Sequence, residues 1–294
     1  MKMPVVDVAV IGAGPAGIAA AIQLKRFGLE PAVIERERIG GLLVNANLVE
    51  NYPGFPSGIR GVDLVRLFEA QLQRVGVRVS FEEVVALDYA ETFVLKTSRR
   101  EFGARSVVIA TGTRPRSPEG IEIPANAKAR VFFEVHPIAE VAGKTVAIVG
   151  AGDAAFDYAL NLSRRNDVVL LNRTVRRRCL PLLWERVQRT SRIVYKEDTI
   201  LSAVHAAGER LRLIVTGRGG AWELEADYVI FAIGRIPCLD FLSERIKAQI
   251  DRLEGEGMLY RIGDVKNGLY RQTAIAVGDG IRAAMSICER FGDH

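Results

Sequence analysis

One glycine pattern occurs twice in the chain, at Gly12-Ala-Gly14-Pro-Ala-Gly17 and at Gly150-Ala-Gly152-Asp-Ala-Ala155. Each copy follows an apolar run and opens a helical pattern. The first glycine permits a tight turn, the second lets a pyrophosphate approach the backbone, and the small third residue lets the helix pack on the strand. The helix N-terminus then faces the anion. Two copies predict an α/β fold with two Rossmann-like dinucleotide-binding domains.

The residue expected at the end of the second strand differs between the two copies. Glu35 stands as far after Gly12 as Arg173 stands after Gly150. A carboxylate accepts hydrogen bonds from a ribose diol, whereas an arginine suits a 2′-phosphate. The first copy is therefore predicted to bind the ADP half of FAD, or NAD, and the second copy NADP(H).

Composition narrows the class of protein. The chain has 294 residues, 49% hydrophobic and 26% charged, which is ordinary for a globular protein of two domains. An apolar run of about eighteen residues, as a membrane span needs, is absent from the sequence. We therefore expect a cytoplasmic protein without a membrane partner. Cys179, Cys238 and Cys288 form no C-x-x-C pair, so their spacing excludes a zinc knuckle and argues against a metal site or a local redox disulfide.

Positive charge is concentrated in one segment. Between Arg164 and Arg192 there are nine arginines and two acidic residues. A phosphorylated cofactor accounts for part of this excess. The rest is either a solvated surface or a docking patch for an acidic protein. Nucleic acid is not expected as a partner, because the segment lacks interleaved aromatic residues.

Periodicity and turn residues place the main elements. In the first half we expect helices at 16–27 and 62–75, separated by a long loop at 36–61, and a strand at 106–110. In the second half we expect a strand at 145–149, a helix at 154–165 and a hairpin formed by 211–216 and 221–225. A final helix at 274–291 is too short to form a domain and should return to the first domain.

With these residues assembled, the chain resembles the thioredoxin reductase family of FAD- and NADPH-dependent flavoproteins. The resemblance covers nearly the whole length. Besides the two glycine motifs, it rests on Gly40-Gly41-Leu42, Glu50-Asn51-Tyr52-Pro53-Gly54-Phe55, Ala110-Thr111-Gly112, Gly263-Asp264-Val265 and Tyr270-Arg271-Gln272.

The resemblance implies roles for individual residues. Those expected to hold FAD are Gly12, Gly14, Pro15, Ala16, Glu35, Gly41, Leu42, Asn51, Val84, Thr111, Gly112, Asp264, Arg271, Gln272 and Thr273. Those expected to hold NADPH, with NADH the less favoured nucleotide, are Gly150, Gly152, Asp153, Ala154, Ala155, Arg173, Arg177 and Arg178. The resemblance also implies a homodimer.

One departure from the family pattern bears on the chemistry. The family's C-x-x-C pair would fall at Phe133-Glu134-Val135-His136, where this chain has no cysteine. Exchange between flavin and a disulfide by that route therefore lacks its thiolate. His136 is the one candidate for a catalytic proton donor there, and a packed or solvent-facing histidine is the simpler interpretation.

These observations lead to one main hypothesis and two alternatives. The expected FAD-binding domain comprises residues 1–118 and 242–294, with an NADP(H)-binding domain, 119–241, inserted into it. The expected reaction is hydride transfer from NADPH to FAD, which is then re-oxidised by an external acceptor, with an acidic carrier of the ferredoxin or flavodoxin type favoured. The first alternative is a disulfide reductase that uses other cysteines or a partner's pair. The second is a non-catalytic FAD-binding redox sensor.

Overall fold

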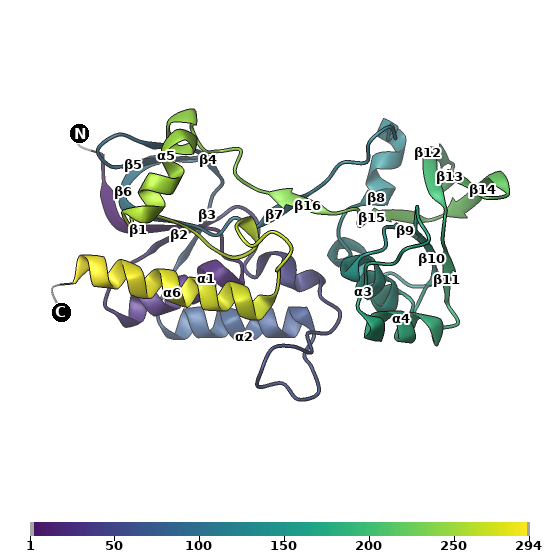
Figure 1. The fold of residues 1–294 in the computed structure, drawn as a ribbon, viewed down its shortest axis with the longest axis horizontal. Helices are drawn as coiled ribbons and strands as arrows, with labels where there is room; N and C mark the ends of the chain where they lie inside the picture. The colour runs from purple at the N-terminus through teal and green to yellow at the C-terminus, as the bar shows by residue number, and fades with distance from the viewer. Residues whose placement is uncertain (1–2, 293–294) are drawn as a thin grey trace. The chain divides into compact units, whose positions relative to one another are not determined.

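The computed structural model describes residues 3–292, which form two compact units (Figure 1). The first unit contains the chain up to Val44, then Val49–Arg114, and the chain from Ile236 onward. The second unit contains Pro115–Arg235 together with the short segment Asn45–Leu48. Strands β7 (Thr113–Pro115) and β16 (Arg235–Pro237), at the two chain crossings between the units, pair with each other.

The first unit is built on a seven-stranded sheet of order β3-β2-β1-β6-β5-β4, in which β17 also pairs with β6. Strands β3, β2, β1, β6 and β17 are paired in parallel, whereas β4, β5 and β6 are antiparallel neighbours. The strands are β1 (Val5–Ile11), β2 (Ala32–Glu35), β3 (Val79–Phe81), β4 (Val84–Tyr89), β5 (Phe93–Thr97), β6 (Glu101–Ile109) and β17 (Leu259–Arg261).

Helices pack on this sheet and on one another. They are α1 (Pro15–Arg26), α2 (Gly61–Arg74), α5 (Glu244–Gly255) and α6 (Thr273–Phe291), with short 3-10 turns η1 (Gly41–Asn45) and η4 (Gly263–Val265). Helix α6 lies alongside α1 (Figure 1). A Cβ at Gly280 would lie 2.2 Å from the carbonyl oxygen of Ala16, so the two helix backbones nearly touch. The expected return of the final helix to the first unit is confirmed.

The second unit has a five-stranded parallel sheet of order β11-β10-β9-β15-β8 and a three-stranded antiparallel sheet, β12-β13-β14. Its strands are β8 (Val131–Phe132), β9 (Thr145–Val149), β10 (Asp167–Leu171), β11 (Ile193–Lys196), β12 (Ile200–Ala207), β13 (Arg210–Gly217), β14 (Gly220–Ala226) and β15 (Tyr228–Phe231). Its helical segments are η2 (Ala125–Arg130), η3 (His136–Ile138), α3 (Asp153–Leu162) and α4 (Pro181–Gln188).

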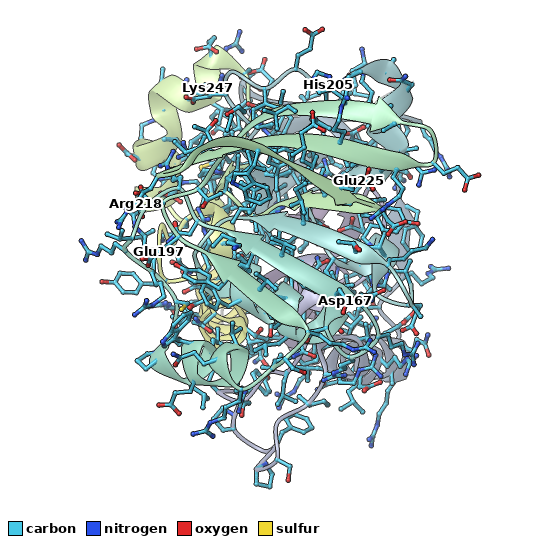
Figure 2. The ribbon with its side chains drawn as sticks, turned by 90° about the vertical axis from the view of Figure 1, so that its right-hand side faces the viewer. Asp167, Glu197, His205, Arg218, Glu225 and Lys247 are labelled. Carbon is cyan, nitrogen blue, oxygen red and sulfur yellow. The ribbon has the colours of Figure 1, made fainter. Side chains whose placement is uncertain are left out.

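Buried side chains alternate with more exposed ones along β13 of the second unit, so one face of this strand lies in the core. Leu211, Leu213 and Val215 of β13 are fully buried. Figure 2 labels five polar side chains of this unit, and all five are exposed: Asp167, Glu197, His205, Arg218 and Glu225. The charge of this unit therefore lies on its surface.

Both glycine motifs have the strand–turn–helix context that the sequence predicts, at β1–α1 and β9–α3. The expected strand at 106–110 is wrong at its start: β6 begins at Glu101, because its first half pairs with β5 to form a hairpin. Within residues 3–292, none of the helices has the length and apolar character needed to cross a lipid bilayer.

Candidate functional site: two nucleotide-binding half-sites

The first glycine turn follows β1, between the ends of β2 and β6. Gly12 has a φ of +105°, and its N–H donates to the carbonyl oxygen of Ile34 at 2.7 Å. A Cβ at Gly12 would lie 2.5 Å from the carbonyl oxygen of Ala110, and a Cβ at Gly17 would lie 1.9 Å from that of Gly12. Both positions therefore require glycine, because backbone passes where a side chain would begin.

Gly14 faces free space instead. A Cβ there would meet no atom of the described chain within 4 Å. Gly14 is the N-cap of α1 and Pro15 its first residue, and no side chain within residues 3–292 caps this helix end. The next residues, beginning with Ala16, thus present backbone N–H groups and the positive end of the helix dipole to the open side of Gly14. This cradle fits a pyrophosphate.

Glu35 ends β2 beside this turn. One carboxylate oxygen, Oε2, accepts the N–H of Ala13 at 2.8 Å, and the other, Oε1, accepts that of Glu37 at 2.9 Å. A carboxylate has about four acceptor positions. Two positions therefore remain for a ribose diol next to the cradle, which fits the ADP half of FAD.

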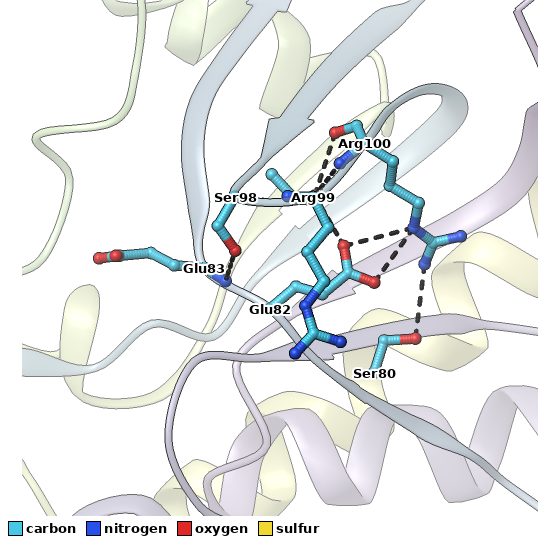
Figure 3. A network of polar contacts seen from close by, with 7 residues as sticks. Ser80, Glu82, Glu83, Ser98, Arg99 and Arg100 are labelled. Carbon is cyan, nitrogen blue, oxygen red and sulfur yellow. Dashed lines mark hydrogen bonds and ion pairs between the residues drawn. The ribbon is translucent and has the colours of Figure 1, made fainter.

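A network of polar contacts holds the chain just before Val84, the first residue of β4 (Figure 3). The N–H of Glu82 donates to the carbonyl oxygen of Glu35 at 2.9 Å, so this segment is tied to the end of β2. The Glu82 carboxylate accepts the hydroxyl of Thr97 at 2.6 Å and lies 3.2 Å from Nε of Arg100. The hydrogen bond from Thr97 and, to a smaller extent, the Arg100 charge lower the pKa of Glu82 against the opposing effect of burial.

The residues predicted for the flavin side come from distant parts of the sequence. Gly41 and Leu42 begin η1, and a Cβ at Gly41 would lie 3.4 Å from the Cα of Gly14. The amide of Asn51 donates from Nδ2 to Oε1 of Gln272 at 2.8 Å. The structure therefore brings Asn51 and Gln272 together. Gln272 is the N-cap of α6, Arg271 precedes it and Thr273 is the first residue of the helix.

Asp264 lies in η4 at the first turn of α1. Its neighbour Gly263 has a φ of +69°, and a Cβ there would lie 2.9 Å from the Cβ of Ala16. The buried carboxylate of Asp279 holds this segment, because its Oδ2 accepts the N–H of Gly263 at 3.1 Å and Nδ2 of Asn267 at 2.6 Å. Asp279 was not among the predicted residues, although a single carboxylate in the otherwise apolar start of α6 was a usable signal.

Thr111 and Gly112 follow β6, in the loop next to the glycine turn. The Thr111 hydroxyl donates to the carbonyl oxygen of Cys238 at 2.7 Å, and the N–H of Cys238 donates to the carbonyl oxygen of Gly112 at 3.1 Å. These two bonds clamp the loop to the chain that follows β16. The contact of this loop with Cys238 was not predicted, since a separation of this length along the chain gives no sequence signal.

The second unit repeats the geometry of the glycine turn. Gly150 has a φ of +146°, and its N–H donates to the carbonyl oxygen of Leu171 at 3.0 Å. A Cβ at Gly150 would lie 2.3 Å from the carbonyl oxygen of Ala232. Gly152 is the N-cap of α3, and a Cβ on it would meet no described atom within 4 Å. Asp153, Ala154 and the buried Ala155 form the first turn of that helix. This second cradle also fits a pyrophosphate.

The arginine-rich loop is attached to the start of α3. The N–H of Arg178 donates to the carbonyl oxygen of Ala151 at 2.9 Å, and Oδ1 of Asp153 accepts the N–H of Leu180 at 2.8 Å. The guanidinium carbon of Arg177 lies 4.1 Å from the ring centroid of Trp184, a cation–π contact. The three predicted arginines, Arg173, Arg177 and Arg178, are all exposed. The backbone of the loop that carries these arginines is thus held beside the cradle, where the loop could meet a 2′-phosphate.

His136 begins η3 in the second unit and is half-buried. Its backbone N–H donates to Oδ1 of Asn45 at 2.9 Å, and the Glu134 carboxylate lies 3.1 Å from Arg235. These contacts position the backbone of His136, and a catalytic role of its imidazole stays a prediction.

The cysteines are distributed over both units. Cys179 belongs to the second unit and Cys238 and Cys288 to the first, and all three are free thiols. Burial raises the pKa of Cys179 and of Cys288, and the Asp153 charge adds to the effect on Cys179. These two thiols are therefore mostly protonated at neutral pH and weakly nucleophilic.

Comparison with known proteins agrees with this geometry. Residues 6–280 match the model of the pyridine nucleotide-disulphide oxidoreductase family. The chain belongs to this family. It is 32% identical to NADPH-dependent thioredoxin reductase 3 of Arabidopsis thaliana over 97% of this chain, which spans 58% of that relative's length. It is 30% identical to thioredoxin reductase of Mycolicibacterium smegmatis, over 95% of this chain and 94% of that protein.

A solved structure extends the family likeness to the fold. Thioredoxin reductase of Lactococcus lactis superposes with a TM-score of 0.85 at 25% identity, covering 97% of this chain and 98% of that chain. This chain is therefore an enzyme. It is an NAD(P)H-dependent flavoprotein oxidoreductase of the thioredoxin reductase type that uses FAD and NADPH. The expected fold class and cofactors are confirmed.

Proposed function

We propose that this enzyme passes electrons from NADPH through FAD to an external acceptor without a redox-active disulfide of its own. FAD, when bound, would supply the redox chemistry, since its flavin can accept a hydride from NADPH and pass the two electrons on to an acceptor. The chain's own residues bind and orient the two nucleotides. The first unit acts as the FAD-binding domain and the second as the NADP(H)-binding domain.

The contacts described above support these assignments. In the first unit, the start of α1 takes the FAD pyrophosphate and Glu35 the adenosine ribose, while Asp264 and the Asn51–Gln272 pair serve the flavin half. In the second unit, the start of α3 takes the NADPH pyrophosphate. Arg173, Arg177 and Arg178 surround its 2′-phosphate. A guanidinium and a phosphate form charge-assisted hydrogen bonds that an NADH ribose does not offer.

The observation that carries the proposal is the placement of the cysteines. A flavin-linked disulfide needs two thiols close together in sequence or in space, with one of them readily ionised. In this chain Cys179, Cys238 and Cys288 stand far apart in the sequence and form no C-x-x-C pair, and burial raises the pKa of Cys179 and of Cys288.

Replacement of all three cysteines by serine tests this directly. We expect the Cys179→Ser/Cys238→Ser/Cys288→Ser variant to keep its NADPH oxidation rate with an artificial acceptor within about twofold. Flavin content and melting temperature serve as controls, because Cys288 is buried and Cys238 contacts the Thr111–Gly112 loop. Loss of turnover in a folded, flavin-loaded variant would contradict the proposal.

We favour an acidic electron carrier of the ferredoxin or flavodoxin type as the acceptor. The exposed Arg164, Arg165, Arg189 and Arg192 of the second unit support this choice, because a cationic surface steers an acidic partner. Arg189→Glu should slow the reduction of such a carrier and make the rate of this reduction less dependent on salt concentration. The rate of ferricyanide reduction should stay unchanged. Equal effects on both acceptors would contradict a docking role.

We further propose that the enzyme forms a homodimer in the cytoplasm. Exposed apolar side chains on α6, namely Ile275, Ile281 and Met285, support contact with a second copy. Light scattering should give twice the monomer mass for the parent protein and the monomer mass for Ile281→Asp. A monomeric parent protein at micromolar concentration would contradict the dimer. Cell fractionation checks the location.

A second candidate keeps the reaction named for the relatives, reduction of thioredoxin, with the partner's own cysteine pair as the direct acceptor of flavin electrons. The family membership favours it. Thioredoxin reduction that persists in the triple serine variant would support this candidate over the carrier hypothesis.

A further inference from the structure

The two glycine turns can be aligned through one equivalent hydrogen bond, which joins the first glycine to the second strand of each sheet. The N–H of Gly12 donates to Ile34 in the first unit, and that of Gly150 donates to Leu171 in the second. The residue directly after this acceptor is Glu35 in the first unit and Asn172 in the second. The structural counterpart of Glu35 is therefore Asn172, and Arg173 stands one position beyond it. The second unit has one residue fewer than the first between the first glycine and the residue that accepts its N–H bond. Equal spacing along the sequence therefore aligned Glu35 with Arg173 instead of Asn172.

Glu35 and Asn172 use their side chains differently. The Glu35 carboxylate accepts the N–H of Ala13 and so points back to its own glycine turn. Asn172 is only 3% exposed, and its amide points into its own loop. From Nδ2 it donates to the carbonyl oxygen of Arg176 at 3.2 Å and to the hydroxyl of Tyr195 at 2.9 Å.

Thr174 completes the contacts of this amide. Oδ1 of Asn172 accepts the N–H of Thr174 at 3.2 Å. The hydroxyl of Thr174 lies 3.4 Å from the same Oδ1. The same hydroxyl lies 3.1 Å from the carbonyl oxygen of Arg176. The backbone from Asn172 to Arg176 is thus folded around one buried amide, which uses both of its donors and its acceptor oxygen there.

Tyr195 links this loop to the core of the second unit. Its ring centroid lies 6.0 Å from that of Phe156 and 5.1 Å from that of Trp184. Trp184 is also the ring beneath the Arg177 guanidinium. The loop is therefore held through Asn172 and Tyr195 at its start, through Trp184 in its middle, and through Arg178 at its end.

We propose that Asn172 is a positioning residue that sets the selectivity of this enzyme for NADPH over NADH. It is buried and acts through the loop, whose shape fixes the directions in which Arg173 and Arg177 leave the backbone. Arginines held in place lose less conformational freedom on binding a phosphate than arginines on a mobile loop. The inference rests on the proposed role of these arginines at the 2′-phosphate.

The test compares two ligands that differ only in the 2′-phosphate, adenosine 2′,5′-bisphosphate and 5′-AMP, by calorimetry on the FAD-loaded protein. Asn172→Ala should weaken binding of the bisphosphate tenfold or more and change binding of 5′-AMP by less than twofold. Tyr195→Phe removes one of the contacts of Asn172 and should give a smaller loss with the same selectivity.

The chain provides a matched control in Asn166, at the other end of β10. This residue is 1% exposed and its Nδ2 donates to the carbonyl oxygens of Val141 and Leu162. Asn166→Ala removes an equally buried amide from the same unit, so it should lower the melting temperature and leave the ratio of the two affinities unchanged.

Arg173→Glu separates failure of this inference from failure of the proposed NADPH site. An unchanged affinity of that variant for the bisphosphate would reject the site itself. A weakened Arg173→Glu variant with an unchanged affinity ratio in Asn172→Ala and Tyr195→Phe would reject only the role of Asn172. Should Asn172→Ala fail to fold, Tyr195→Phe and Thr174→Val decide the outcome, because each keeps the buried amide.

Discussion

At the scale of single residues, the glycines of the first motif have different physical reasons to be glycine. Gly12 and Gly17 leave no room for a Cβ because backbone atoms lie too close. Gly14 has an ordinary φ and free space on its open side. The fold therefore does not require glycine at this position, and we propose that a bound pyrophosphate does.

Gly14→Ala separates ligand binding from folding. We expect the apoprotein to keep its urea-unfolding midpoint, because the added methyl meets no described atom. FAD affinity should fall about tenfold or more, which corresponds to about 1.4 kcal/mol, since the methyl occupies the approach of the pyrophosphate. Fluorescence quenching of FAD measures the affinity. Unchanged FAD binding would place the pyrophosphate elsewhere.

Glu82 is a residue whose charge stabilises the turn before Val84. Its folded-state pKa is lowered, so its contribution to stability is complete above the ordinary glutamate pKa of about 4.3 and is lost as pH falls through the lower folded value. Glu82→Gln should therefore be less stable than the parent protein at pH 7, by about 1.5 kcal/mol for a hydrogen bond to a charged group. The gap should close below pH 4.

Urea unfolding at several pH values between 7 and 3.5 measures that gap. Thr97→Val removes the hydroxyl that contributes most to the pKa shift and should reduce the pH dependence in the same way. A stability difference between Glu82→Gln and the parent protein that is equal at every pH would show that the carboxylate charge is not what holds this turn.

At the scale of elements, the contact between α1 and α6 holds the segment with Asp264 at the first turn of α1. Gly280 allows this contact, since a Cβ there would lie 2.2 Å from the Ala16 carbonyl oxygen and 2.9 Å from the Ala20 nitrogen. Gly278 on the same helix faces open space. The two glycines therefore serve different purposes within one turn of α6.

Alanine at each of these glycines should have opposite effects on stability. Gly280→Ala forces α6 away from α1 and should cost about 1–3 kcal/mol as an overpacked contact. Gly278→Ala should stabilise the protein by about 0.5–1 kcal/mol, because glycine is a poor residue for a helix interior. Thermal unfolding of both variants measures this difference. Equal effects would mean that the helices do not pack as closely as the structure indicates.

Local signals explain which elements could be predicted. The glycine motifs, α1, α2 and α6 were visible because their patterns repeat within a few residues. Helix α5 was missed although Ser243 caps it through the N–H of Ile246, and α4 was missed although it opens with Pro181. Helix α4 has only 8 residues, and the buried residues are few in both helices: Val187 in α4, and Ile246 and Leu253 in α5.

The contacts that organise the half-sites were beyond prediction from sequence patterns. The bond between Asn172 and Tyr195 depends on parallel pairing of β10 with β11, and the Glu82 network depends on the register of β2, β3 and β5. Sequence spacing predicted which residues face a nucleotide. It did not identify those that hold them, because their partners are set by tertiary structure.

At the scale of the whole molecule, two nucleotide-binding units of similar construction serve one electron path in this account. Each unit has a first glycine with positive φ, an open helix N-terminus and, directly after the carbonyl that accepts this glycine's N–H, a residue that we propose helps to select the ribose. The units differ where selectivity is needed, with a carboxylate at Glu35 and an arginine loop organised by Asn172. That difference predicts FAD on the first unit and NADPH on the second.

The most direct test of this account is an anaerobic titration of the FAD-loaded protein with NADPH, and separately with NADH, followed by flavin absorbance. We predict that NADPH bleaches the flavin rapidly and stoichiometrically, that NADH does so only at much higher concentration, and that the triple serine variant behaves like the parent protein. A flavin that neither nucleotide bleaches, or bleaching that requires the cysteines, would contradict it.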